Sequence, residues 1–166
     1  MIWSSNLGTI TPVLMALSVG VANAENAKEL TGFYKLVSID NTRPDGRVVA
    51  QYGLNPKGSL ALGANGRYVL FIRRSELPTF ATDNVREGTA QENRAIVRGS
   101  IAHTGTYEVD AKEQSITFHI EASTFPNQDG ATQKRQFTLE SDDLKYVVTT
   151  PSVGSGIATL VWRRTR

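Results

Sequence analysis

Residues 58–73 read GSLALGANGRYVLFIR, two short alternating segments joined by a glycine-rich turn. Leu60 and Leu62 share one face of 58–62, and Tyr68, Leu70 and Ile72 share one face of 67–73, if side chains alternate with the period of a β-strand. Asn65-Gly66 between them supplies the positive φ that tight hairpin turns require. The stretch therefore predicts an antiparallel β-hairpin.

The same pattern continues along the chain. Short turn sequences such as Asp-Gly separate the alternating segments. Consecutive strands with short turns favour an up-and-down meander, and closing a meander removes its exposed edges. We therefore expect an all-β fold, an antiparallel up-and-down barrel of about eight strands and one short helix, whose interior can hold one small ligand. The further predicted strands are 33–40, 47–51, 104–109, 115–123, 133–140, 144–150 and 157–164.

One region breaks the strand pattern. Thr89 and Glu92 have the spacing of a helix capping box, which predicts a short helix over 89–99. The preceding loop, 75–88, is long for a connection within a compact domain. Two alternatives fit it: a lid over the mouth of a pocket, or a plug that closes the barrel. The apolar lid candidates are Leu77, Phe80 and Ile96.

The first 24 residues contain no charged side chain and end in Ala22-Asn23-Ala24. Such a stretch predicts a cleaved secretory signal, 1–24, followed by one domain, 25–166, in a secreted or periplasmic protein. The alternative is a transmembrane anchor, but Pro12 and Gly20 interrupt the apolar stretch, which is short for the about 20 residues that a bilayer requires. We expect no stable membrane insertion after cleavage.

The composition excludes several classes of protein. The chain has no cysteine, so disulfides, cysteine-bound zinc and iron–sulfur clusters are absent. Lys and Arg number 18 against 16 Asp and Glu, a net charge of +2 without an interleaved aromatic and basic face. We therefore expect no nucleic-acid partner.

The most polar predicted hairpin covers residues 119–137, HIEASTFPNQDGATQKRQF. Side chains alternate across a strand, so the polar residues of its first strand share one face, opposite the apolar ones. If the apolar face is turned inward, His119 points to solvent. The residues of that polar face are Thr117, His119, Glu121 and Ser123.

The second strand of this hairpin gives the opposite indication for Arg135. Gln133 and Arg135 share a face with Phe137 and Leu139, which we expect to point inward. A buried unpaired guanidinium is very unfavourable, so Arg135 needs a negative or carbonyl partner. That partner belongs either to a ligand or to the protein, where the candidates are His119, Glu121, Glu92 and Glu108.

The sequence gives little support for nucleophilic catalysis or metal binding. His119 and Ser123 lie about 13 Å apart along one strand face, too far for a Ser–His pair. No His-x-His, His-Glu-x-x-His or Gly-x-Ser-x-Gly sequence occurs, so we expect no metal and no cofactor. The second histidine, His103, is expected on the surface between the helix and the next strand.

Several short motifs follow one another along the chain. They are GFYKLVS at 32–38, YGLNPKG at 52–58, GRY at 66–68, GTY at 105–107, WRR at 162–164, and His119, Ser123, Pro126, Asn127, Gly130, Gln133, Arg135 and Phe137 in the 119–137 hairpin. Together these motifs resemble the bacterial and fungal lipocalin-like domain family, and the resemblance covers nearly all of 30–164. It implies a calycin-like barrel that binds a small molecule, without implying a reaction. In this family an opening Trp packs under a terminal Arg; here that position holds Tyr34, and we expect Arg164 to pack over it.

Three hypotheses for function follow. The first is an exported barrel that binds a small hydrophobic molecule carrying a carboxylate or carbonyl. The second is a cofactor-free isomerase or cyclase, with His119 as acid or base and Arg135 stabilising an enolate. The third is a structural envelope protein with a packed interior. For the first, the expected ligand-binding residues are His119, Arg135, Glu121, Ser123, Gln133 and Tyr107.

Overall fold

The structure, a computed structural model, describes residues 29–152 and 155–165 of the chain. The predicted signal, 1–24, lies outside the described residues. The described part forms one antiparallel sheet and the helix α2, Ala90–Gly99. Its strands are β1 Gly32–Thr42, β2 Val48–Ala50, β3 Lys57–Leu62, β4 Arg67–Arg73, β5 Ser100–Asp110, β6 Ser115–Ser123, β7 Thr132–Glu140, β8 Asp143–Val148 and β9 Ile157–Thr165.

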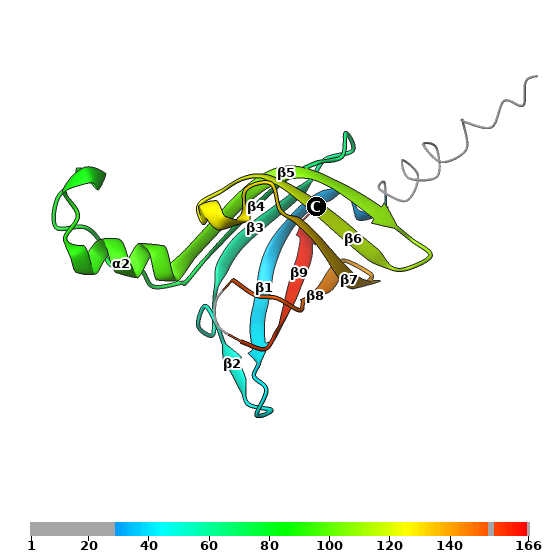
Figure 1. Cartoon of the computed structure of the whole chain (residues 1–166), viewed down its shortest axis with the longest axis horizontal. Helices are drawn as coiled ribbons and strands as arrows, with labels where there is room; N and C mark the ends of the chain where they lie inside the picture. The colour runs from blue at the N-terminus through cyan, green and yellow to red at the C-terminus, as the bar shows by residue number, and fades with distance from the viewer. Residues whose placement is uncertain (1–28, 153–154, 166) are drawn as a thin grey trace, which may run out of the picture.

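The sheet closes on itself. Neighbouring strands follow chain order from β3 to β9, and β1 pairs with both β3 and β9 (Figure 1). The closing pair runs from Phe33 opposite Thr165 to Thr42 opposite Ile157. The short strand β2 pairs only with the end of β1. The predicted up-and-down barrel is confirmed, with eight strands in the ring and β2 beside it.

The helix and the capping box are also confirmed. The Thr89 hydroxyl accepts a hydrogen bond from the backbone N–H of Glu92 at 3.2 Å. The Glu92 carboxylate in turn accepts one from the backbone N–H of Thr89 at 2.7 Å. These bonds satisfy two N–H groups that a helix leaves free at its start, so α2 begins here.

Two bulges shift the strand faces away from strict alternation. In β1 the register with β9 shifts between Leu36 and Ser38, so Ile39 is buried on the same side as Leu36. In β6 the register with β5 shifts at Glu121, opposite the step from Thr104 to Gly105. An extra residue on one strand reverses the orientation of every side chain that follows it.

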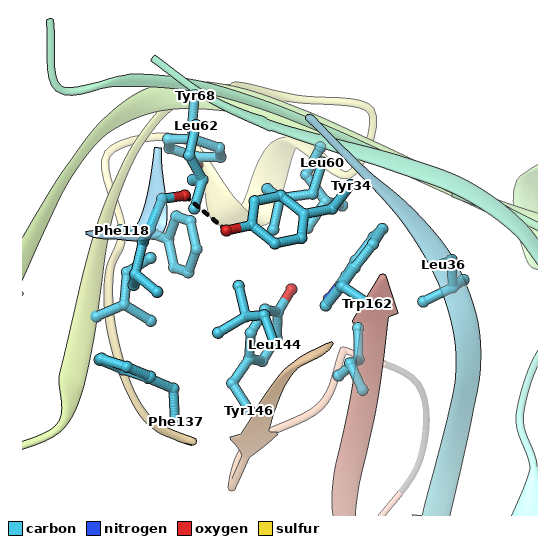
Figure 2. Close-up of a cluster of buried hydrophobic side chains, with 14 of the residues drawn as sticks. Tyr34, Leu36, Leu60, Leu62, Tyr68, Phe118, Phe137, Leu144, Tyr146 and Trp162 are labelled. Atoms are coloured by element: carbon cyan, nitrogen blue, oxygen red, sulfur yellow. Dashed lines mark hydrogen bonds between the residues drawn. The ribbon is translucent and has the colours of Figure 1, made fainter. Parts of the chain in front are cut away.

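Large side chains from opposite strands fill one end of the barrel (Figure 2). This end, here called the Leu30 end, lies at the start of β1 and is covered by Leu30, which is fully buried. The Tyr68 and Phe118 rings meet edge to face with centroids 4.7 Å apart. Such packing contributes beyond area burial and leaves little room for a ligand. The other end, where β4 and β5 connect to α2, is called the α2 end.

Tyr34 and Arg164 face each other across the closing pair of strands. The Tyr34 hydroxyl donates to the carbonyl oxygen of Leu30 at 2.9 Å and accepts from Arg164 Nη2 at 2.7 Å. The Arg164 guanidinium carbon lies 5.2 Å from the centre of the Tyr34 ring, within the range of a cation–π interaction. The expected packing of Arg164 over Tyr34 is confirmed.

Residues 74–99 form an arm beside the barrel (Figure 1). Within the arm, Leu77 packs closely on Gly99, where an added Cβ would lie 2.6 Å from Leu77 Cδ2, and Phe80 packs on Gly88, where it would lie 2.7 Å from Phe80 Cε2. The main contact of α2 with the sheet is with β5, the next strand in the chain. Loop 75–88 is therefore folded on α2 and does not plug the barrel.

We predict that Tyr34→Phe lowers the free energy of unfolding by about 1–2 kcal/mol, because Arg164 and the Leu30 carbonyl lose a buried hydroxyl partner. Equilibrium urea denaturation followed by tryptophan fluorescence measures this. The neighbouring Phe33→Leu, at a side chain 51% exposed, is the control and should change stability by less than about 0.5 kcal/mol. Equal stability of wild type and Tyr34→Phe would show that the hydroxyl does not stabilise the closure.

Candidate functional site

The barrel interior contains a cavity of about 50 Å³ at the α2 end. Apolar residues form most of its wall, and polar side chains from β5, β7 and the turn before β7 enter it. This mixture of an apolar wall and a few converging polar groups is typical of small-molecule sites. The described lining residues are Ile39, Gln51, Tyr52, Leu70, Ile72, Ile101, His103, Gln128, Gln133, Arg135, Val148, Thr150, Pro151, Ser152, Ala158 and Leu160.

Arg135 is the charged residue of the cavity, and only 6% of it is exposed. Its guanidinium carbon lies against two aromatic rings, 4.7 Å from the centre of Phe118 and 4.9 Å from that of Tyr146. Nη2 donates to the side-chain oxygen of Gln133 at 2.5 Å, whereas Nε has no acceptor. Arg135 points inward, as the sequence predicts.

The predicted protein partners of Arg135 are all engaged elsewhere. Glu121 pairs with Arg67 on the outer face, with Nη2 and Oε2 2.6 Å apart. Glu92 caps α2, and Glu108 lies 3.9 Å from the imidazole of His119. Within residues 29–152 and 155–165, Arg135 forms no ion pair, so a buried positive charge faces the cavity with ring faces and one amide as its partners.

His103 shares the cavity with Arg135 and is also 6% exposed, which contradicts its predicted place on the surface. Strand β5 begins at Ser100 and not at 104, so the alternation that buries Tyr107 continues back to His103. The His103 Nδ1 and the Tyr68 hydroxyl are 2.8 Å apart. Burial, aided by the nearby charge of Arg135, lowers the pKa of His103 to about 3, so the imidazole is neutral at pH 7.

His119 and Glu121 lie outside the barrel. The His119 side chain is 41% exposed, and its Nδ1 is 3.1 Å from the Thr132 hydroxyl. Apolar residues of β6 fill the interior, so alternation turns both polar side chains outward. Of the predicted ligand-binding residues, Arg135 and Gln133 therefore line the cavity, whereas His119 and Glu121 do not.

Ser123 and Tyr107 contribute differently from the prediction. The bulge at Glu121 brings Ser123 into register with His103, but its hydroxyl donates to the Gln128 side chain at 3.1 Å, and it is Gln128 that lines the cavity. The Tyr107 hydroxyl donates to the Gly63 carbonyl at 2.9 Å, in the turn between β3 and β4 at the Leu30 end. Tyr107 is thus part of the packed core.

The sequence reasoning missed His103 and Gln128 as cavity residues. For His103 a signal existed, because it continues the buried face of Tyr107 and Gly105 by two residues. Its contact with Tyr68 joins β4 and β5, and depends on register. Gln128 enters from the short helix η2, Pro126–Gln128, whose geometry alternation does not describe.

A groove of about 600 Å³ lies at the mouth of the cavity, between α2, the β6–β7 turn and the β2–β3 loop. Tyr52, Ile101 and Ser152 line both the cavity and the groove, so the two spaces adjoin. Of the three lid candidates, Ile96 lines the groove, whereas Leu77 and Phe80 pack within the arm. Among the described cavity residues none belongs to 75–99, so the arm borders the mouth and does not cover the cavity.

The described residues contain neither a cluster of metal ligands nor a membrane-spanning helix. No three acidic or histidine side chains there are grouped closely enough to hold a metal ion. No helix in the described ranges has the length and apolar character needed to cross a bilayer.

A closed eight-stranded antiparallel barrel with a small interior cavity belongs to the class of small up-and-down β-barrels, whose interior can hold one small ligand. Residues 31–165 match the profile of the family described as lipocalin-like domain, and the chain belongs to this family. No curated protein matches the chain significantly. The family resemblance in the sequence motifs is therefore confirmed, and the fold agrees with it.

We predict that Arg135→Met leaves the free energy of unfolding unchanged or raises it by up to about 2 kcal/mol, because an apolar side chain of similar volume avoids burying an unpaired charge. Urea denaturation measures the effect. Arg163→Met is the control: Arg163 pairs with Asp143 at 2.8 Å on the surface, where a loss of less than about 1 kcal/mol is expected. A loss of several kcal/mol in Arg135→Met would mean that Arg135 serves the stability of the fold.

A second prediction concerns acid stability. Between pH 6.5 and about 3 the unfolded His103 binds a proton that the folded one does not, so stability falls as the pH is lowered through this range. The contribution is about 1.4 kcal/mol per pH unit at most. We expect the stability of His103→Gln, measured by urea denaturation from pH 7 to 4, to fall less steeply than that of wild type.

His119→Gln, on the outer face, controls for the loss of a histidine. Parallel pH profiles for wild type and His103→Gln would contradict a buried neutral His103.

Proposed function

We propose that this chain is an exported protein that binds a small hydrophobic molecule carrying a carboxylate or carbonyl group at the α2 end of its barrel. One observation carries the proposal: Arg135 is buried beside a cavity without a charged partner among the described residues. Export rests on the uncharged 1–24 stretch and its Ala22-Asn23-Ala24 end.

A ligand carboxylate would give Arg135 the negatively charged hydrogen-bond partner that the described residues do not supply. Charge-assisted hydrogen bonds from a guanidinium are about twice as strong as neutral ones, and burial in a low-dielectric site strengthens them. The Nε hydrogen of Arg135 is buried without an acceptor among the described residues, so the guanidinium is not fully satisfied by the protein. Neutral His103 and the amides of Gln133 and Gln128 add polar contacts in the same cavity without adding a competing negative charge.

The hypothesis of an isomerase or cyclase is weaker because it lacks a base. His119, its proposed acid or base, lies on the outer face of the barrel. His103 lies in the cavity, but an imidazole with a pKa of about 3 accepts protons poorly at neutral pH. Neutral His103 is better suited to orient a ligand than to abstract a proton from it.

The hypothesis of a packed structural barrel explains the Leu30 end and leaves the α2 end unexplained. Tyr34, Tyr68, Phe118, Tyr146 and Trp162 fill the barrel from that end. A protein that only needed a solid core would gain nothing from the Arg135 guanidinium at the α2 end, since apolar groups of equal volume pack without desolvating a charge.

We predict that protein purified from its own host carries an acidic small molecule in native mass spectrometry, and that a fluorescent fatty acid binds the emptied protein. Arg135→Gln should weaken that binding about 10- to 100-fold, because a charged hydrogen-bond partner is lost. Arg67→Gln removes an arginine from the outer face as the matched control and should leave affinity unchanged.

The same spectra give the mass of the exported chain, which cleavage after Ala24 would set to that of residues 25–166. Absence of any co-purified molecule, together with equal probe binding by wild type and Arg135→Gln, would contradict the proposed function.

A further inference from the structure

We propose that the ligand is a linear amphiphile, a monocarboxylate with an unbranched apolar chain, held with its carboxylate inside the barrel at Arg135 and its chain outside, in the groove beside α2. This inference rests on the proposed function and goes beyond it in naming the ligand class and the orientation. It follows from the unequal sizes and unequal chemistry of two adjoining spaces.

The interior cavity is too small for a whole hydrophobic ligand. Its volume of about 50 Å³ has room for about three to five groups of the size of a water molecule. A carboxylate and the carbon next to it fill that space. The buried cation at its wall selects the carboxylate as the part that enters.

The groove outside is large enough for the rest of the molecule. Its volume is about 600 Å³, and it meets the cavity at Tyr52 and Ile101. Val97 on α2 is 77% exposed and Phe125 before β7 is 41% exposed, although both are apolar. An alkyl chain lying between them would cover apolar surface that now faces water, which stabilises a complex in proportion to the area removed.

The reverse orientation, with the chain inside and the carboxylate at the groove, fits less well. Arg74 and Arg98 line the groove and could meet a carboxylate there. In that arrangement several methylene groups would have to enter the cavity of about 50 Å³ and pack against the Arg135 guanidinium, which would stay unpaired. Both the volume and the buried charge therefore favour the carboxylate inside.

The test uses the whole exported protein and three straight-chain acids: butanoate, octanoate and dodecanoate. Calorimetry measures the longer acids, and chemical-shift titration of the His103 imidazole measures the shortest. Affinity should rise about two- to fourfold for each added methylene until the groove is filled. In wild type, the terminal methyl of octanoate should give nuclear Overhauser effects to Val97 and Phe125.

Substitutions in the groove distinguish ligand contacts in the groove from those in the cavity. Val97→Ser and Phe125→Ser should weaken dodecanoate binding about tenfold and leave butanoate unchanged, since only the longer acid reaches the groove. Val85→Ser is the matched control, because Val85 is 76% exposed on the same arm but does not line the groove. Arg135→Gln should weaken all three acids.

The outcomes distinguish this inference from the function beneath it. If no acid binds at any length, the proposed function fails, and the inference with it. If all three acids bind equally and Arg135→Gln abolishes binding, the proposed function stands, but the groove does not hold the alkyl chain of the ligand. Overhauser effects from the terminal methyl to Phe118 or Tyr146 would overturn the orientation, whatever the variants do.

Discussion

The pairing of β1 with β9 is the contact on which the rest of the molecule depends. It joins the first and last long strands of the described chain along the whole length of β9. The pairing converts a meander with two open edges into a ring. Only after closure does the sheet have an interior in which Tyr34, Phe118 and Trp162 can bury one another. Arg164 belongs to the closing strand and hydrogen-bonds to Tyr34, so the end of β9 helps to cover the first buried side chain of β1.

Closure creates one interior with two unlike ends. At the Leu30 end, aromatic and aliphatic side chains fill the space, so stability is concentrated there. At the α2 end, Arg135 and His103 are buried beside a cavity. A buried cation and an imidazole held neutral by burial stabilise the fold poorly, and such groups are typical of sites that meet a ligand. The rings of Phe118 and Tyr146 lie at the boundary and hold the guanidinium in place.

Much of this arrangement could be predicted from the sequence. Alternation placed the strands within a few residues of their observed ends, as for 115–123, which is β6. It also turned Arg135 inward. It failed where a bulge adds a residue: strict alternation groups Ser123 with His119, whereas the register shift at Glu121 aligns Ser123 with His103. The start of β5 was placed four residues late, and this moved His103 from the interior to the surface of the predicted barrel.

By itself, the sequence determined which side chains alternate, where the turns lie, where α2 begins and that Arg135 must seek a partner. These are local properties, because strand period, turn chemistry and helix capping depend on residues a few positions apart. Only the tertiary structure decided that Glu121, Glu92 and Glu108 are engaged elsewhere and that His103, in contact with the Tyr68 hydroxyl, joins Arg135 at one cavity. The reason is that partner choice follows from strand register and barrel closure, which bring together residues of distant segments and separate others that lie close in sequence.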